Sequence, residues 1–226
     1  MKKFVVFLSA CCFSIVCFGQ IHEIGVFVGG SNYIGDIGRE NFIYPNDFMG
    51  GVLYKRNINP RIALRGNFTY AKISDNDKDS NNLGRYNRGI SFKNSVKELA
   101  VGMEFNFFEY NLDNFQMTHT PYILLQLGAV NYRVAEDEIG VQEYDYKNKT
   151  SFIMPIGVGY KFKLTEGFAA AAEIRAQYTW QDDLDYNNKE IESLTYGNPN
   201  DNDWYVLTGI SFVYTFGRPP CYTTSF

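Results

Sequence analysis

The sequence predicts an all-β fold: an eight-stranded antiparallel transmembrane β-barrel, closed, with a lumen filled by polar side chains. The main observation is a hairpin pattern, because residues 152–164 and 168–180 alternate in polarity with the period of two that is typical of strands. One face of both arms is apolar and ends in aromatic residues, whereas the other carries glycine, charge and amides. An apolar outer face with aromatic ends is typical of strands that contact lipid.

The second observation is an export signal at the N-terminus. An apolar run, residues 4–18, follows two lysines, so we expect a signal peptide at residues 1–19. A retained helical anchor is disfavoured, because the run is shorter than the roughly 20 residues that a spanning helix needs. An alternative is a lipobox that ends at Cys11, whose cysteine would then be lipidated.

Cysteine and charge limit the partners of the mature chain. Ordinary signal cleavage removes three of the four cysteines and leaves Cys221 alone, so no intrachain disulfide is expected. The loss of the two signal lysines changes the formal charge from −4 to −6. Nucleic acid is therefore not an expected partner.

The barrel domain is expected at residues 20–217. Its first strand places Ile24 and Val26 outward and Phe27 inward, and the fourth strand places Leu99 outward and Glu98 inward. The fifth strand is apolar at nearly every position, so its pattern leaves the facing open. The expected strands are, in order, residues 23–32, 48–56, 62–71, 92–108, 121–133, 152–164, 168–180 and 204–216.

The connections between these strands fall into two classes. Those after strands one, three, five and seven are long and polar, and those after strands two and six are very short. Outer-membrane barrels separate long extracellular loops from short periplasmic turns in this way, so we expect both termini in the periplasm. Two of the long stretches, residues 74–88 and 133–150, are expected to be solvated loops, and the first of them to bury nothing.

Charged residues occur on the inward face of several strands. A soluble lipocalin-like barrel is the alternative, but its interior is apolar. We expect the inward charges to be paired with one another, since unpaired buried charge is costly, and we expect no open pore. These residues are Arg65, Glu98, Glu104, Lys161, Lys163, Glu173 and Arg175.

Candidate catalytic chemistry is sparse. An outer-membrane lipid-modifying enzyme is an alternative that needs histidine beside serine and a carboxylate at one rim. His22 and His119 are both expected at the periplasmic side, as solvated or interfacial residues, so the sequence predicts no catalytic residue. No cysteine and histidine spacing indicates a metal site, and no cofactor is expected. The acidic stretch 182–185 could offer oxygen ligands to Ca²⁺, but its spacing is not that of an EF-hand, and a solvated loop is expected.

The tail beyond the last strand, residues 218–226, is the least usual part of the chain. Phe216 is the natural closing aromatic of the barrel, yet a proline pair follows and keeps the chain extended. A disordered periplasmic stub is one interpretation, and a partner-binding segment is the other. The hypothetical partner-binding residues are Arg218, Pro219, Pro220, Cys221 and Tyr222.

The two ends of the barrel carry a family resemblance. The opening stretch, residues 24–36, and the closing stretch, residues 214–222, resemble PorG, the outer-membrane barrel of the Bacteroidetes type IX secretion system. This resemblance implies a non-enzymatic component of the protein secretion and gliding motility machinery. It implies contact with outer-membrane lipid and with the periplasmic ring of the PorK/GldK lipoprotein and PorN/GldN. A generic adhesin or stress barrel, whose extracellular loops bind ligands, is a further alternative.

Overall fold

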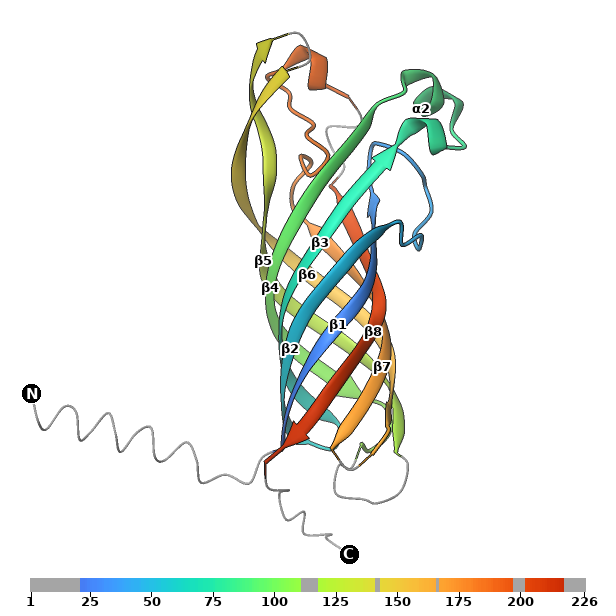
Figure 1. Ribbon diagram of the computed structural model, residues 1–226, viewed down its shortest axis with the longest axis vertical. Coiled ribbons are helices and arrows are strands. Elements are labelled where there is room, and N and C mark those ends of the chain that lie inside the picture. Colours follow the sequence, from blue (N-terminus) through green and yellow to red (C-terminus); the bar gives the residue numbers. More distant parts are fainter. Residues whose placement is uncertain (1–20, 111–117, 141–142, 166, 197–201, 218–226) are drawn as a thin grey trace, which may run out of the picture.

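The computed structural model describes residues 21–110, 118–140, 143–165, 167–196 and 202–217, which form a closed antiparallel barrel of eight strands (Figure 1). Each strand pairs with the next along the chain, and β8 pairs with β1. The fold class predicted from the sequence is confirmed. The strands are β1 (Ile21–Ile34), β2 (Asp47–Asn59), β3 (Ile62–Asn76), β4 (Ser91–Asn106), β5 (His119–Gly140), β6 (Glu143–Lys163), β7 (Phe168–Thr179) and β8 (Trp204–Phe216).

The two ends of the barrel differ. The end where β1 begins and β8 ends carries the short turns, and we call it the terminal end (Figure 1). The opposite end, the loop end, carries longer segments with short helices: η2 (Asp77–Asp79), α2 (Leu83–Arg88) and η3 (Glu192–Leu194). No helix in the described ranges has both the length and the apolar character to cross a membrane.

The inward and outward assignments made from the sequence are confirmed. Ile24 and Val26 are exposed on the outer wall, whereas Phe27 is buried in the lumen. The structure also decides the facing of β5, which the sequence left open: Leu125 is exposed and Leu124 is buried. The inward face of β5 also carries bulky residues, such as Tyr122 and Tyr132, so both faces of this strand are apolar and the sequence pattern cannot tell them apart.

Two glycines face each other where the barrel closes. Gly29 of β1 is in register with Gly209 of β8. A Cβ at Gly29 would lie 2.2 Å from the backbone oxygen of Thr208, and a Cβ at Gly209 would lie 2.3 Å from that of Val28. The closing seam therefore depends on the absence of a side chain at both positions.

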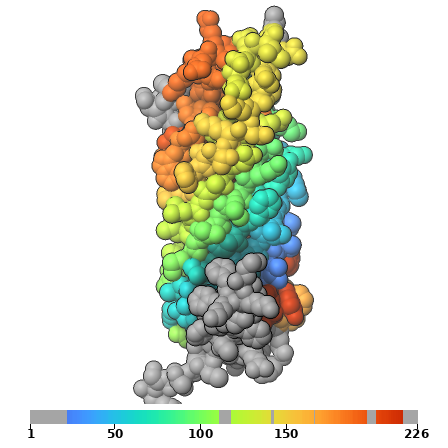
Figure 2. All heavy atoms as spheres, turned by 90° about the vertical axis from the view of Figure 1, so that its left-hand side faces the viewer, coloured from blue at the N-terminus to red at the C-terminus, as the bar shows by residue number. Residues whose placement is uncertain are grey.

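The prediction of a loop at residues 133–150 is wrong, because most of these residues form strands. β5 and β6 continue to Gly140 and Glu143 as a hairpin, with register shifts near its tip. The hairpin stands beyond the rest of the barrel, so polar residues are tolerated on both faces and the polarity pattern that marks a half-buried strand is lost. Figure 2 shows this hairpin, in yellow, beside the orange segment that follows β7, and the amide of Asn188 donates to the Ala135 carbonyl across this contact (2.9 Å).

The expectation that residues 74–88 bury nothing is also wrong. Asp77 is fully buried, and its carboxylate accepts hydrogen bonds from the backbone of Gly38 (2.9 Å) and from the guanidinium of Arg88 (2.7 Å). The backbone of Ile90 donates to the same carboxylate (3.1 Å). A polar residue can be buried when its lone pairs are satisfied in this way, which composition alone does not reveal.

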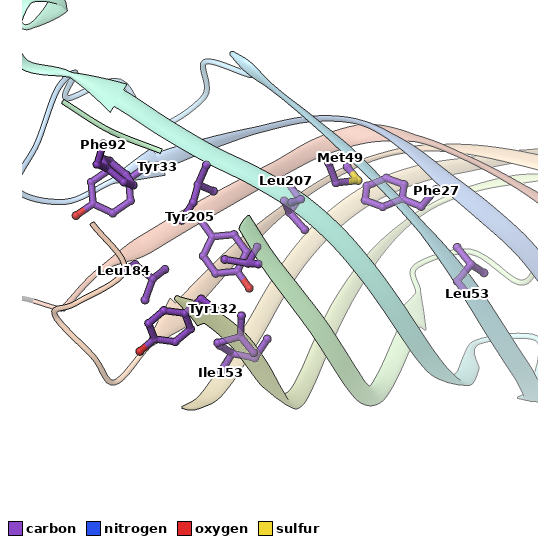
Figure 3. Packing of buried hydrophobic residues seen from close by; sticks show 14 of the residues in the cluster. Phe27, Tyr33, Met49, Leu53, Phe92, Tyr132, Ile153, Leu184, Tyr205 and Leu207 are labelled. Carbon is purple, nitrogen blue, oxygen red and sulfur yellow. The ribbon is translucent and has the colours of Figure 1, made fainter. Parts of the chain in front are cut away.

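The lumen contains an apolar cluster as well as charge. Tyr33 packs edge-on against Phe92 with ring centroids 4.7 Å apart, and the cluster extends along the lumen past Met49 to Leu53 (Figure 3). The sequence predicted a polar lumen, and that prediction holds only for part of its length. The labelled members of the cluster are Phe27, Tyr33, Met49, Leu53, Phe92, Tyr132, Ile153, Leu184, Tyr205 and Leu207.

Candidate functional site

Glu104 of β4 is the centre of the buried charges. Its carboxylate contacts the ammonium nitrogens of Lys55 (2.9 Å) and Lys161 (2.5 Å) and the guanidinium of Arg65 (3.2 Å). All four side chains are at most 2% exposed. The sequence identified Glu104, Arg65 and Lys161 as lumenal residues but missed Lys55, although its position in the alternation of β2 indicates the inward face.

Glu173 of β7 is a second centre, linked to the first through Arg65. Arg65 binds Glu173 with two nitrogens, at 2.5 and 3.0 Å, and the hydroxyl of Tyr122 donates to the same carboxylate at 2.5 Å. Arg175 lies 3.4 Å from Glu173 and 3.6 Å from Glu98. The expectation that the inward charges pair with one another is confirmed for six of the seven predicted residues, Arg65, Glu98, Glu104, Lys161, Glu173 and Arg175.

Carboxylates and cations are balanced in this network. Glu23 completes it, lying 4.0 Å from Lys55. The network joins strands from opposite sides of the lumen with buried charges, so it fixes the shape of the barrel and fills its centre. We call it the lumenal charge network, and its members are Glu23, Lys55, Arg65, Glu98, Glu104, Lys161, Glu173 and Arg175.

A different polar cluster closes the barrel at the loop end. The hydroxyl of Tyr33 contacts a carboxylate oxygen of Asp185 at 3.0 Å and one of Asp203, and it accepts from the backbone N–H of Asp36 at 3.3 Å. The backbone N–H of Leu184 donates to Asp203 (2.9 Å). These contacts hold the segment after β7 over the lumen, and we call this cluster the mouth.

The mouth requires one bound proton beyond that of the phenol. A tyrosine hydroxyl has a single hydrogen, so it can donate to only one of the two carboxylates that it contacts. The other contact is a hydrogen bond only if that carboxyl is protonated. Burial, followed by the charge of Asp185, raises the pKa of Asp203 well above its ordinary value, and burial likewise raises the pKa of Asp185. Burial and Asp36 raise the pKa of the neighbouring Asp182 to about 6.

The mouth should therefore loosen as the pH rises. An acid whose folded pKa lies above its unfolded pKa binds more protons when folded, so its contribution to stability is lost between those two values. From pH 5 to pH 8 we expect exchange of the Leu184 amide, corrected for its intrinsic pH dependence, to accelerate about tenfold or more, since one pKa unit corresponds to a factor of ten. Hydrogen exchange read by mass spectrometry or NMR measures this.

The matched variants are Asp203→Asn and Asp145→Asn. Asp203→Asn removes one of the titrating carboxyls and should weaken the pH dependence, whereas Asp145→Asn, at an exposed residue of β6, should leave it unchanged. An equal acceleration in all three proteins would exclude the mouth as the source of the effect.

The acidic stretch 182–185 is not the solvated loop that the sequence predicted. Leu184 and Asp185 are buried, and Asp183 bonds to the hydroxyl of Tyr132 and the ammonium of Lys149, both at 2.5 Å. The carboxylates thus point to separate protein partners. Within the described ranges, no three histidine, cysteine or acidic side chains converge as metal ligands do.

Both histidines bond to tyrosines at the terminal end. Nδ1 of His22 lies 2.6 Å from the hydroxyl of Tyr54, and Nδ1 of His119 lies 2.5 Å from that of Tyr160. Each ring also stacks on its tyrosine. His119 is the first residue of β5, whereas the sequence placed it in the connection before that strand. The contacts are those of interfacial aromatic pairs, and they are not the serine and carboxylate contacts of a hydrolase.

The predicted partner-binding residues, Arg218, Pro219, Pro220, Cys221 and Tyr222, lie outside the described residues, as do the predicted signal peptide and part of the connection before β5. The structure brings together the residues of the lumen and of the mouth. Sequence reasoning missed the mouth because its members come from three distant segments, and the only signal was the isolated tyrosine on the inward face of β1.

Comparison with solved structures finds small outer-membrane barrels. Neisserial surface protein A is 13% identical, with 88% of this chain and 97% of that chain covered and a TM-score of 0.50. A major outer membrane protein from Thermus thermophilus is 11% identical, covering 87% and 99% with a TM-score of 0.47. Ail of Yersinia pestis, in complex with the heparin analogue sucrose octasulfate, is 12% identical, covering 87% and 99% with a TM-score of 0.46. At these identities the likeness to Neisserial surface protein A shows the fold alone.

Sequence comparison places the chain in a family without an assigned activity. No curated protein matches it. A family model described as "Domain of unknown function (DUF6089)" matches residues 2–225, which is nearly the whole chain. The chain belongs to this DUF6089 family.

Proposed function

We propose that the protein is an outer-membrane β-barrel with both termini in the periplasm, and that it anchors the periplasmic ring of a type IX secretion system. One observation carries the membrane part of the proposal: a belt of exposed apolar side chains around the outer wall. Soluble proteins rarely expose a continuous apolar surface of more than a few hundred Å². We call this surface the apolar belt, and it includes Ile24, Val26, Val52, Phe68, Leu99, Val101, Leu125, Leu127, Ile156, Val158, Ile210 and Phe212.

Aromatic residues border the apolar belt. Toward the loop end, the ring of Tyr178 lies 5.0 Å from that of Trp180 and 4.7 Å from that of Trp204. Toward the terminal end, Phe168 packs against Tyr214 at 5.2 Å. Aromatic girdles at both edges of an apolar band are typical of barrels in lipid, so they support a membrane location.

The filled lumen supports an anchoring role over transport. The lumenal charge network occupies the centre of the barrel with side chains that are nearly or fully inaccessible to water. An eight-stranded barrel has room only for its own side chains. A barrel of this kind offers the membrane a rigid attachment point, and its remaining surfaces are its two ends.

The resemblance of the two chain ends to PorG supports the choice of partner, a ring of the PorK/GldK lipoprotein and PorN/GldN. Both resembling stretches include residues near the terminal end, where β1 begins and β8 ends. We expect the proline pair at residues 219–220 to keep the tail extended, a form suited to a groove or a sheet edge of a partner. We therefore assign ring contact to Arg218, Pro219, Pro220, Cys221 and Tyr222.

Deletion of residues 219–226 tests this assignment. The barrel should still assemble and remain heat-modifiable on gels, because closure needs only the strand up to Phe216. Recovery of the ring proteins with the solubilised barrel should fall, and secretion with it. Affinity purification followed by mass spectrometry of the associated chains measures the recovery.

Cys221→Ser is the matched single variant. A covalent tie would give a crosslinked band that reductant removes and that this variant lacks, whereas a packing contact would give none. If the truncated barrel assembles and keeps normal ring recovery and secretion, the tail is a stub and the assignment is wrong. If no ring protein is recovered even with the intact chain, a generic adhesin or stress barrel becomes the better proposal.

A further inference from the structure

A segment of the loop end folds back over the outer wall of the barrel. Asn32 lies on the outward face of β1, yet it is only 3% exposed. Its amide donates to the carbonyl of Phe42 (3.2 Å), and its side-chain oxygen accepts from the backbone of Tyr44 (3.3 Å). Residues 41–44 are thus held against the outside of β1, with the side chain of Phe42 itself 75% exposed.

A cavity of about 660 Å³ lies between this segment and the strands beside it. Its floor is formed by the outward residues Ala176 of β7 and Val206 of β8, which are in register with each other and with Asn32. Trp204 borders the same cavity, at the aromatic edge of the apolar belt. The cavity therefore lies at the level of a lipid headgroup and the start of its acyl chains. We call it the outer-wall pocket.

The polar side of the outer-wall pocket carries both signs of charge. Arg39, Arg85 and Glu40 line it. Arg39 is already paired with Asp79 at 3.2 Å. Among the described residues, Arg85 hydrogen-bonds to the Gly38 carbonyl through Nη1 alone (3.2 Å), so its other N–H donors are available to a ligand. Glu40 is exposed and offers an acceptor on the same side.

We propose that the outer-wall pocket binds a membrane lipid whose headgroup carries a phosphate and a primary ammonium. The phosphate accepts from Arg85, the ammonium donates to Glu40, and the start of an acyl chain lies on Ala176 and Val206. A guanidinium matches a phosphate in geometry, and a carboxylate matches a primary ammonium, so the two signs of charge select this zwitterion. This inference rests on the proposed membrane location.

Trp204 is the probe that tests the pocket. The chain has two tryptophans, so Trp180→Phe leaves Trp204 as the only one. This variant is reconstituted in phosphatidylcholine vesicles that contain a small fraction of brominated lipid, with bromine near the headgroup end of the chain. We expect brominated phosphatidylethanolamine to quench Trp204 fluorescence at a several-fold lower fraction than brominated phosphatidylcholine or phosphatidylglycerol.

Substitutions within the pocket identify the contacts. In the Trp180→Phe background, Arg85→Gln and Glu40→Gln should each reduce the preference for phosphatidylethanolamine about three- to tenfold, the effect of one charge-assisted hydrogen bond near the surface. Ala176→Phe, which fills the apolar floor without touching the lumen, should abolish the preference. Arg133→Gln, at the loop end but outside the pocket, is the control and should leave it unchanged.

The outcomes separate this inference from the membrane location. Equal quenching by the three brominated lipids means that Trp204 contacts ordinary belt lipid, which overturns the pocket. Stronger quenching by phosphatidylglycerol overturns the role of Glu40 and the zwitterion. No quenching by any brominated lipid contradicts the membrane location itself.

Discussion

Glu104→Gln is expected to destabilise the barrel by about 3–5 kcal/mol, the cost of removing one partner from a buried charge pair. The substitution keeps the shape of the side chain but removes the negative charge that three cations share. Lys161 is affected most, because Glu104 is the carboxylate that it contacts at 2.5 Å. Lys55 keeps Glu23 at 4.0 Å, and Arg65 keeps Glu173 at 2.5 Å. The loss is measured as a shift of the urea or thermal midpoint in detergent, read by the heat-modifiable band on gels.

Glu109→Gln is the matched control for this substitution. It removes the same charge from an exposed pair with Arg61, whose side chains are 67% and 47% exposed, so it should cost less than about 1 kcal/mol. Lys161→Met added to Glu104→Gln should restore part of the stability, because it removes the cation left without its carboxylate. If Glu104→Gln and Glu109→Gln shift the midpoint equally, the lumenal charge network does not hold the barrel together.

Val158→Arg is expected to prevent most of the chain from assembling in the membrane. Val158 is 56% exposed on the outer face of β6, within the apolar belt, and is flanked by Ile123 of β5 and Ile174 of β7. A cation at the bilayer midplane of a barrel costs roughly 2–4 kcal/mol. The fraction of heat-modifiable barrel in purified outer membranes measures the defect.

Ile139→Arg is the matched control, because it introduces the same cation outside the apolar belt. Ile139 is 65% exposed, but it lies near the tip of the β5–β6 hairpin, beyond the apolar belt. A cation there should cost roughly 0–1 kcal/mol, the value near an interface. Similar assembly of the two variants would contradict contact between the apolar belt and lipid.

Two errors of the sequence prediction have a common physical cause. The hairpin at residues 133–150 and the buried Asp77 both lie at the loop end, outside the region where one strand face must be apolar. There the chain is held by backbone pairing and by satisfied polar groups, which leave no period in the hydrophobicity. The predicted strands are accordingly too short at the loop end of β3, β5 and β6, whereas the predicted bounds of β8 agree with those observed.

The sequence by itself determined the class of fold and the facing of each alternating strand, because a period of two sends successive side chains to opposite walls whatever the partner strand is. It thereby identified Arg65 and Glu173 as lumenal. Only the tertiary structure decided that these two pair, since they are 108 residues apart and meet across the lumen once closure has fixed the register. The same holds for Tyr33 and Asp203 at the mouth, 170 residues apart, and for Ala176 and Val206 in the outer-wall pocket. Strand pattern sets the direction in which a side chain points, and the register around the closed ring sets what it meets.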